Sequence, residues 1–275
     1  MLPPAMRWDA RYFQMGFQLL LLSYGLMYLH WNAEWLNYTL YISSALLLQL
    51  VIEYFANKKY DSWKSALISS LSLCLLLKTN DWYICLLASA LTVTSKYIFR
   101  FKGKHLFNPS AFGIVATVYL SKDAWLSSGQ WGSGLILLLG VSALGFIVVT
   151  RVQKLDISLA FLLTFIGLLF ARQILYLHWP LDFFVQSVTT GSLLLFSFFM
   201  ISDPKTAPNH PVARIIWAML IASVAFYLSA FKWIYNTQIL VLVSAAPLVP
   251  LFDKLFKAKL FQWKKPIIYK TQTNL

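Results

Sequence analysis

Apolar segments of about 20 residues, separated by short basic loops, follow one another along almost the whole chain and constrain its fold more than any other feature. A segment of this length crosses the hydrocarbon core of a bilayer as a helix. Of the 275 residues, 59% are hydrophobic and only 12% are charged, about half the charged fraction of a soluble domain. The sequence therefore predicts an all-α, polytopic membrane helical bundle.

Ten segments are expected to span the membrane and to form a single transmembrane domain over residues 1–252. These segments are 13–30, 36–56, 63–78, 81–99, 106–121, 134–150, 156–177, 182–201, 212–231 and 234–252. The third, fifth and sixth are short for a span. Because ten spans divide into five and five, and an odd number per half inverts one half relative to the other, two inverted five-helix halves are expected.

The distribution of basic residues tests this topology. Lysine and arginine favour the cytoplasmic loops of membrane proteins. With the N-terminus inside, all but four of the 23 Lys and Arg residues lie on the cytoplasmic side; the four are Lys78, Lys122, Arg172 and Lys232. We therefore expect a multi-pass protein of the bacterial cytoplasmic (inner) membrane with both termini in the cytoplasm. The net charge of +13 is then explained by basic loops that orient the protein in the membrane and contact anionic lipids of the bilayer. No nucleic acid partner is expected.

The last segment, residues 253–275, differs from the spans. Apolar and aromatic residues such as Leu255, Phe256 and Trp263 alternate with lysines. This pattern is typical of an amphipathic helix at a membrane surface, so a basic amphipathic cytoplasmic tail is predicted.

A first polar motif, His105-Leu-Phe-Asn-Pro-Ser-Ala-Phe-Gly113, interrupts the apolar pattern. Asn108 suits a helix N-cap, and Pro109 and Ser110 suit the first helical turn. A helix N-terminus flanked by basic residues is a ready site for an anion such as phosphate. The alternative is an ordinary capped helix beside cytoplasmic loop charges, and the residues alone favour that alternative.

A second polar motif, Phe198-Phe-Met-Ile-Ser-Asp-Pro-Lys-Thr-Ala-Pro208, closes the eighth segment. Asp203 either caps this turn or pairs with Lys205 or Arg214. A structural turn is the simpler interpretation, but Asp203, Lys205 and Thr206 can also bind a polar ligand. Irregular polar backbone persists in a membrane only where it is buried in protein or lines a cavity. The two motifs therefore supply the candidate site: Asn108, Pro109, Ser110, Asp203, Lys205 and Thr206.

Other polar or reactive residues have simpler explanations. Glu53, near the inner end of the second segment, is expected to reach the interface by snorkelling. Cys74 and Cys85 are expected to be small core residues, because two lone cysteines make neither a disulfide framework nor a zinc site. The sequence contains no nucleotide-binding glycine motif, zinc-protease motif or nucleophile elbow, so no metal site is expected and no catalytic residue is assigned.

Together the two motifs, Asn-Pro-Ser-Ala-Phe-Gly and Phe-Phe-Met-Ile-Ser-Asp-Pro-Lys-Thr-Ala-Pro, resemble those of a known family. This family contains the B subunit of the sodium-pumping NADH:quinone reductase and the D subunit of the Rnf complex (NqrB/RnfD). The resemblance is clearest over residues 104–255. Within the family the chain looks most like a short branch found near enediyne-type gene clusters (UnbU-like).

The resemblance implies a ten-helix bundle of two inverted halves that holds flavins and passes electrons across the membrane. Full-length members attach FMN covalently through the threonine of a Ser/Asp-Gly-Ala-Thr motif between the two polar motifs. That motif is absent between Gly113 and Phe198. A non-covalent flavin, either FMN or riboflavin, or another redox ligand such as quinone, remains open.

The leading hypothesis is an integral membrane electron-transfer subunit that binds a flavin-like cofactor non-covalently and works with a separate redox protein or complex. It makes the chain a component of a membrane oxidoreductase. The alternatives are a small-solute channel or transporter of related fold, and a cofactor-free membrane scaffold.

Overall fold

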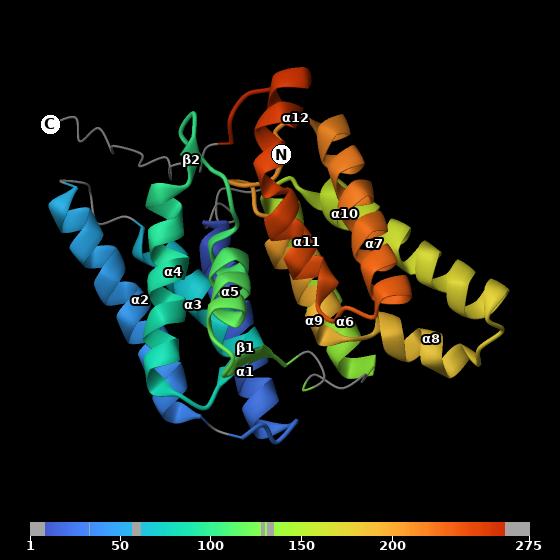
Figure 1. Cartoon of the computed structure of the whole chain (residues 1–275), viewed down its shortest axis with the longest axis horizontal. Coiled ribbons are helices and arrows are strands. Elements are labelled where there is room, and N and C mark those ends of the chain that lie inside the picture. The colour runs from blue at the N-terminus through green and yellow to red at the C-terminus, as the bar shows by residue number, and fades with distance from the viewer. Residues whose placement is uncertain (1–8, 33, 57–61, 128–129, 131–134, 262–275) are drawn as a thin grey trace, which may run out of the picture.

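The computed structural model describes residues 9–32, 34–56, 62–127, 130 and 135–261. It shows a bundle of helices with two short pairs of strands, one near each end of the bundle (Figure 1). Large apolar side chains are exposed along many helices, as a lipid-facing surface requires. The predicted all-α membrane helical bundle is therefore confirmed.

The first half of the chain forms five helices: α1 (Ala10–Met27), α2 (Trp35–Phe55), α3 (Trp63–Leu76), α4 (Trp82–Ile98) and α5 (Pro109–Leu120). The second half forms α6 (Leu135–Arg151), α7 (Leu155–Phe170), α8 (Leu181–Val188), α9 (Gly191–Leu195), α10 (Pro211–Lys232), α11 (Thr237–Ala245) and α12 (Val249–Leu255). Three short segments continue helices: the π-helical η3 (Ala171–Tyr176) and η4 (Phe196–Met200), and the 3₁₀ turn η5 (Ala246–Leu248).

Two pairs of strands connect the helices of the first half. Strand β1 (Leu77–Thr79) pairs antiparallel with β4 (Ala124–Leu126), and β2 (Arg100–Phe101) pairs antiparallel with β3 (Lys104–His105). The β2–β3 turn consists of two residues with positive φ, Lys102 at 48° and Gly103 at 80°. Such a turn makes the chain reverse tightly, so the hairpin folds back over the end of α4.

The expected count of ten spans is not confirmed. Four helical stretches are long and apolar enough to cross a membrane: Trp35–Phe55, Leu155–Tyr176, Pro211–Lys232 and Thr237–Leu255. The third and fifth segments form shorter helices, because α3 ends where the chain extends into β1 and α5 begins only after the β2–β3 hairpin. The eighth segment is broken: α8 and the α9–η4 helix are bent by 43° relative to each other, at Thr189 and Thr190.

The packing order of the helices is the same in both halves. In the first half α1 packs on α3 and α2 packs on α4; in the second half α6 packs on α9 and α7 packs on α10. Contacts of α1 with α6 and of α5 with α11 join the halves. This order agrees with two related halves, whose inversion stays a prediction.

Close helix packing depends on small residues, as is usual in membrane bundles. A Cβ atom added to Gly113 on α5 would lie 1.8 Å from the Thr92 Oγ1 atom on α4. A Cβ added to Gly145 on α6 would lie 2.6 Å from the ring of Phe198. The glycine of the first motif therefore lets α5 approach α4 closely, and Cys74 and Cys85 are buried and free, as expected of core residues.

The expected amphipathic tail is not helical where the structure describes it beyond α12. Helix α12 ends at Leu255, and residues 256–261 adopt no helix. Residues 262–275 lie outside the described part of the chain. Asp253, at the start of the expected tail, belongs to α12 and contributes to the polar interior described below.

Candidate functional site: a polar cavity at the basic end of the bundle

The first polar motif caps α5 as the sequence predicts. Asn108 is the N-cap and Pro109 opens the helix. The Asn108 Oδ1 atom accepts hydrogen bonds from the backbone N–H of Ala111 at 3.1 Å and from the hydroxyl of Ser110 at 2.9 Å. These bonds fix the orientation of the Asn108 amide and leave its Nδ2 group pointing toward other partners.

The Asn108 amide joins the two polar motifs. Its Nδ2 group donates to the carbonyl oxygen of Met200 at 3.2 Å and to Asp203 Oδ2 at 3.4 Å. Asn108 and Asp203 are 95 positions apart in the chain. The structure therefore brings together the two segments that the sequence singled out separately.

Asp203 shapes the loop that follows η4. Its Oδ1 atom accepts a hydrogen bond from the backbone N–H of Lys205 at 2.9 Å, and its carbonyl oxygen accepts one from the backbone N–H of Ala207 at 2.9 Å. Burial raises the pKa of Asp203 above its usual value, although the Lys205 amide opposes this change. The sequence left open whether Asp203 caps this turn or pairs with Lys205 or Arg214. The structure shows that Asp203 caps the turn, and that Arg214 pairs with Asp156 instead.

A polar cavity of about 400 Å³ opens beside these motifs. Five of the six candidate residues line it: Asn108, Pro109, Ser110, Asp203 and Lys205. Thr206 does not line it. Thr206 is buried on the far side of the loop, where it borders a small void with Trp217.

The lining of the cavity is strongly basic. Among the described residues that line it, Asp203 is the one acidic side chain, whereas the basic ones are Arg11, Lys96, Arg100, His105 and Lys205. His105 Nδ1 lies 3.0 Å from the carbonyl oxygen of Lys96. Burial, together with the nearby Arg100 charge, lowers the pKa of His105 to about 4, so this imidazole is neutral at pH 7.

Several lining residues were missed from the sequence. Lys96 was counted only as an inner loop charge, yet it is 4% exposed. One face of α3 and the residue before it also contribute a row of hydroxyl groups: Ser62, Ser65, Ser69 and Ser72. Their spacing of three to four residues is that of one helix face, and this signal was present in the sequence.

Two phenylalanines give the cavity an apolar part. Phe198 and Phe199 of the second motif both line it. Phe199 also stacks on Phe17 of α1, with ring centroids 5.0 Å apart. The cavity thus combines aromatic surface with hydrogen-bonding groups, which is the usual composition of a site for a small organic ligand.

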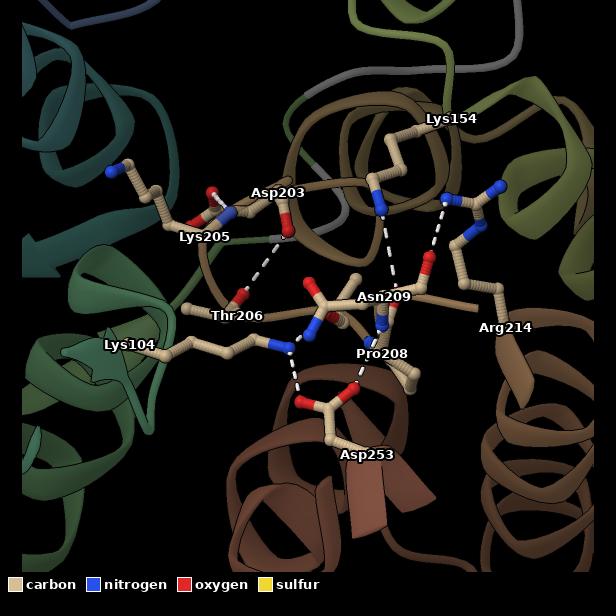
Figure 2. A network of polar contacts seen from close by, with 10 residues as sticks. Lys104, Lys154, Asp203, Lys205, Thr206, Pro208, Asn209, Arg214 and Asp253 are labelled. Atoms are coloured by element: carbon tan, nitrogen blue, oxygen red, sulfur yellow. Dashed lines mark hydrogen bonds and ion pairs between the residues drawn. The ribbon is translucent and has the colours of Figure 1, made fainter. Parts of the chain in front are cut away.

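The opposite face of the Asp203–His210 loop is held by an anchor network, which we define as Lys104, Lys154, Asp156, Arg214 and Asp253. Figure 2 labels its members other than Asp156. Lys104 Nζ lies 2.8 Å from Asp253 Oδ2, and Asp253 Oδ1 accepts from the backbone N–H of Asn209 at 2.8 Å. Lys154 Nζ donates to the carbonyl oxygen of Pro208 at 3.3 Å, and Arg214 Nε donates to Asp156 Oδ2 at 2.7 Å.

The expectation that Glu53 snorkels to the interface is wrong. Glu53 is 1% exposed, and its Oε1 atom accepts from the Gln49 Nε2 group at 3.0 Å. Its Oε2 atom has no hydrogen-bond partner within the described residues. Helix α2 is covered by α3 and α4 on this side, so the carboxylate lies inside the bundle.

These features define a class: an integral membrane helical protein with a polar cavity between its helices. No group of side chains suited to a metal ion occurs in the described parts of the chain. The model of the NQR2, RnfD, RnfE family matches residues 119–262, more than half of the chain, and the chain belongs to this family. No curated protein matches it.

Family membership makes the protein a membrane-embedded subunit of an electron-transport complex. The matched range contains the second polar motif and begins after the first. The predicted family is therefore confirmed, and the match does not assign the chain to the short branch.

Proposed function

We propose that the protein binds FMN or riboflavin non-covalently in the polar cavity and moves electrons within or across the membrane with a separate redox protein. The single observation that carries this proposal is the meeting of Asn108 and Asp203 at the wall of a cavity in a member of an electron-transport family.

The cavity suits a flavin in size and chemistry. Its volume of about 400 Å³ falls within the range of about 300–1,000 Å³ that is typical of small-molecule sites. Phe198 and Phe199 offer apolar surface for a flat ring system, and Ser110 and the α3 serines offer hydroxyl groups for its polar edge. A bound flavin would supply one- and two-electron redox chemistry.

Within the proposed site, each motif residue has a separate role. Asn108 is held by Met200 and Ser110, so its position is fixed before a ligand binds. Lys205 lines the cavity, and in the described part of the chain its ammonium group makes no hydrogen bond or ion pair. It is therefore available to stabilise negative charge on a ligand.

The remaining parts of the proposal concern location and partners. The described basic residues near the cavity predict that this end faces the cytoplasm of a bacterial inner membrane. The redox partner is another subunit of the complex, with quinone as a further candidate for electron exchange. Because the family's attachment motif is absent from the sequence, the flavin is proposed to be released by denaturation.

The test is an absorbance and fluorescence spectrum of the detergent-purified protein, recorded before and after acid precipitation. We expect a yellow protein whose flavin fluorescence appears in the supernatant. The double variant Asn108→Ala, Asp203→Ala should lose the cofactor, whereas Asp123→Ala, which changes an exposed carboxylate between α5 and β4, should keep it.

A folded, colourless wild-type protein that takes up no added flavin would refute the proposal. It would favour the channel or the scaffold, which solute flux in liposomes then separates. Flavin retained in the acid pellet would refute non-covalent binding.

A further inference from the structure

The lysine at position 96 is unusual because its ammonium group is buried without a hydrogen-bond partner among the described residues, with Asp203 and Glu53 as its electrostatic neighbours. Lys96 lies near the C-terminal end of α4, is 4% exposed, and lines the polar cavity. Its Nζ group has no hydrogen-bond partner among the described residues. An unpaired buried ammonium group is costly, so such a group at a cavity points to a ligand that supplies the missing partner.

Three further cations line the same cavity from different parts of the fold. Arg100 follows Lys96 by four residues, Lys205 comes from the second motif, and Arg11 comes from α1. Arg11 is neutralised by Asp9, at an Nη2–Oδ2 distance of 2.6 Å. Arg100 donates its Nε hydrogen to the carbonyl oxygen of Lys96 at 2.6 Å, which fixes the side chain and leaves its charge unneutralised by that contact.

We define the cationic wall as Lys96, Arg100 and Lys205. Two carboxylates act on these three charges. Asp203 lines the cavity, and its Oδ1 and Oδ2 atoms already accept from Lys205 N–H and Asn108 Nδ2; the buried Glu53 attracts Lys96 without a hydrogen bond to it. The N-terminus of α5 lies at the same cavity through Asn108, Pro109 and Ser110. A helix N-terminus adds partial positive charge, so positive charge exceeds negative charge at the site. Lys96 is buried, Lys205 is partly buried and Arg100 is exposed.

We infer that the cationic wall binds a phosphate monoester, so that the cavity selects FMN over riboflavin. This inference rests on the proposed flavin function and narrows it. A phosphate monoester carries a charge between −1 and −2 at neutral pH and has three strong acceptor oxygens. It can therefore accept hydrogen bonds from Lys96, Arg100 and Lys205 together, and charge-assisted bonds of this kind are the strongest available.

The test compares FMN, riboflavin and inorganic phosphate on the detergent-purified full chain after removal of bound flavin. Binding is followed by quenching of flavin fluorescence at pH 7 and low salt. We expect FMN to bind at least about tenfold more tightly than riboflavin, a difference of about 1.4 kcal/mol. Inorganic phosphate should weaken the binding of FMN and leave the binding of riboflavin unchanged.

The variant Lys96→Gln should reduce the affinity for FMN to that for riboflavin and leave riboflavin binding intact. Lys102→Gln is the matched control, because Lys102 is an exposed lysine of the β2–β3 turn that does not line this cavity. If Lys96→Gln does not fold, Lys205→Gln serves as the second variant and should reduce the preference for FMN in the same direction.

The outcomes separate this inference from the proposed function. Equal affinities for FMN and riboflavin, insensitive to phosphate, overturn the inference and keep the flavin function. In a third outcome the protein binds neither flavin, but the ³¹P signal of inorganic phosphate broadens with wild type and not with Lys96→Gln. This result refutes the flavin function and supports the phosphate site. Failure to bind flavin or phosphate overturns both.

Discussion

The two faces of the loop from Asp203 to His210 differ in how their charges are matched. On one face the anchor network pairs its cations with carboxylates or carbonyl oxygens, as Lys104 and Arg214 show. On the other face Lys96 and Lys205 line a cavity, and neither ammonium group has a hydrogen-bonding partner in the described structure. Matched charges fix the position of the loop, and the cations without hydrogen-bond partners lie beside the cavity in which we propose that a ligand binds.

The anchored face also accommodates the proline at position 208 of the second motif. Pro208 has no N–H group to satisfy, and its carbonyl oxygen accepts from Lys154. The Asp203 carbonyl oxygen accepts hydrogen bonds from the backbone N–H groups of Thr206 and Ala207. An irregular loop thus stays inside the bundle with its polar groups satisfied on the anchored face.

The largest effect is expected when the anchor network is broken. Lys104→Met would leave the Asp253 carboxylate, whose side chain is 20% exposed, facing Asn209 alone. Removing one partner of a buried ion pair costs about 3–5 kcal/mol, and partial exposure places this variant at the lower end of that range. Thermal unfolding in detergent measures the effect.

The control is Lys102→Met on the same hairpin, which should change the unfolding midpoint little. Equal midpoints for Lys104→Met and wild type would show that the anchored face does not stabilise the loop.

The next largest effect is expected at the close contact behind the cavity. Gly113→Ala would place a Cβ 1.8 Å from Thr92 Oγ1 and push α5 away from α4. Asn108 caps α5 and Lys96 lies on α4, so the separation would also move these two cavity residues apart. Overpacking of this kind costs about 1–3 kcal/mol. Gly167→Ala on α7 has open space around the added carbon and should leave stability unchanged or raise it. The pair is compared by thermal unfolding, and similar losses in both variants would contradict the packing argument.

A smaller effect is expected from pH. The pKa of His105 is lowered to about 4 in the folded protein, whereas an unfolded histidine titrates near 6.5. The unfolded state therefore binds a proton first, so this contribution to stability is fully present above pH 6.5 and is lost as the pH falls toward 4. The unfolding midpoint should drop by a few degrees over this range. His105→Gln should flatten the dependence, and an equally steep profile in that variant would refute the assignment.

The smallest effect on stability is expected on the cavity face. Lys96→Met removes a buried ammonium group that has no hydrogen-bond partner among the described residues, and it also removes the attraction of that group to Glu53 and Asp203. These two changes oppose each other, so the ligand-free protein should be about as stable as wild type. The unfolding midpoint of flavin-free Lys96→Met should therefore stay near the wild-type value, whereas that of Lys104→Met should fall below it. A loss of stability in Lys96→Met as large as that in Lys104→Met would remove the distinction between the two faces.

Local features of the fold were predictable from the sequence, and long-range ones were not. Hydropathy located helices near the ends that the structure shows, and Asn-Pro-Ser predicted the cap of α5, because both depend on neighbouring residues. The short length of α3 was not predictable, because it depends on β1 pairing with a strand nearly fifty positions away. The break at Thr189 and Thr190 has no proline to mark it.

The candidate site divides in the same way. Asn108 and Asp203 were singled out as polar residues in apolar surroundings, but their contact depends on how two distant helices pack. Lys96 looked like one more cytoplasmic charge, since charge alone sets topology. Its burial follows from the β2–β3 hairpin, which folds back so that His105 contacts the Lys96 carbonyl. A sequence pattern does not contain that information.

The most direct test of the contrast between the two faces is the shift in unfolding midpoint that added FMN produces. Saturating ligand stabilises a protein that binds it in the folded state, by about 2.7 kcal/mol at one hundred times the Kd. We predict that wild type and Lys104→Met both show the shift, the latter from a lower starting midpoint. Lys96→Met should keep its midpoint and lose about half of the shift, because a tenfold weaker affinity leaves about 1.4 kcal/mol. A full shift in Lys96→Met, or its absence from the wild-type protein, would contradict the assignment of ligand binding to the cavity face.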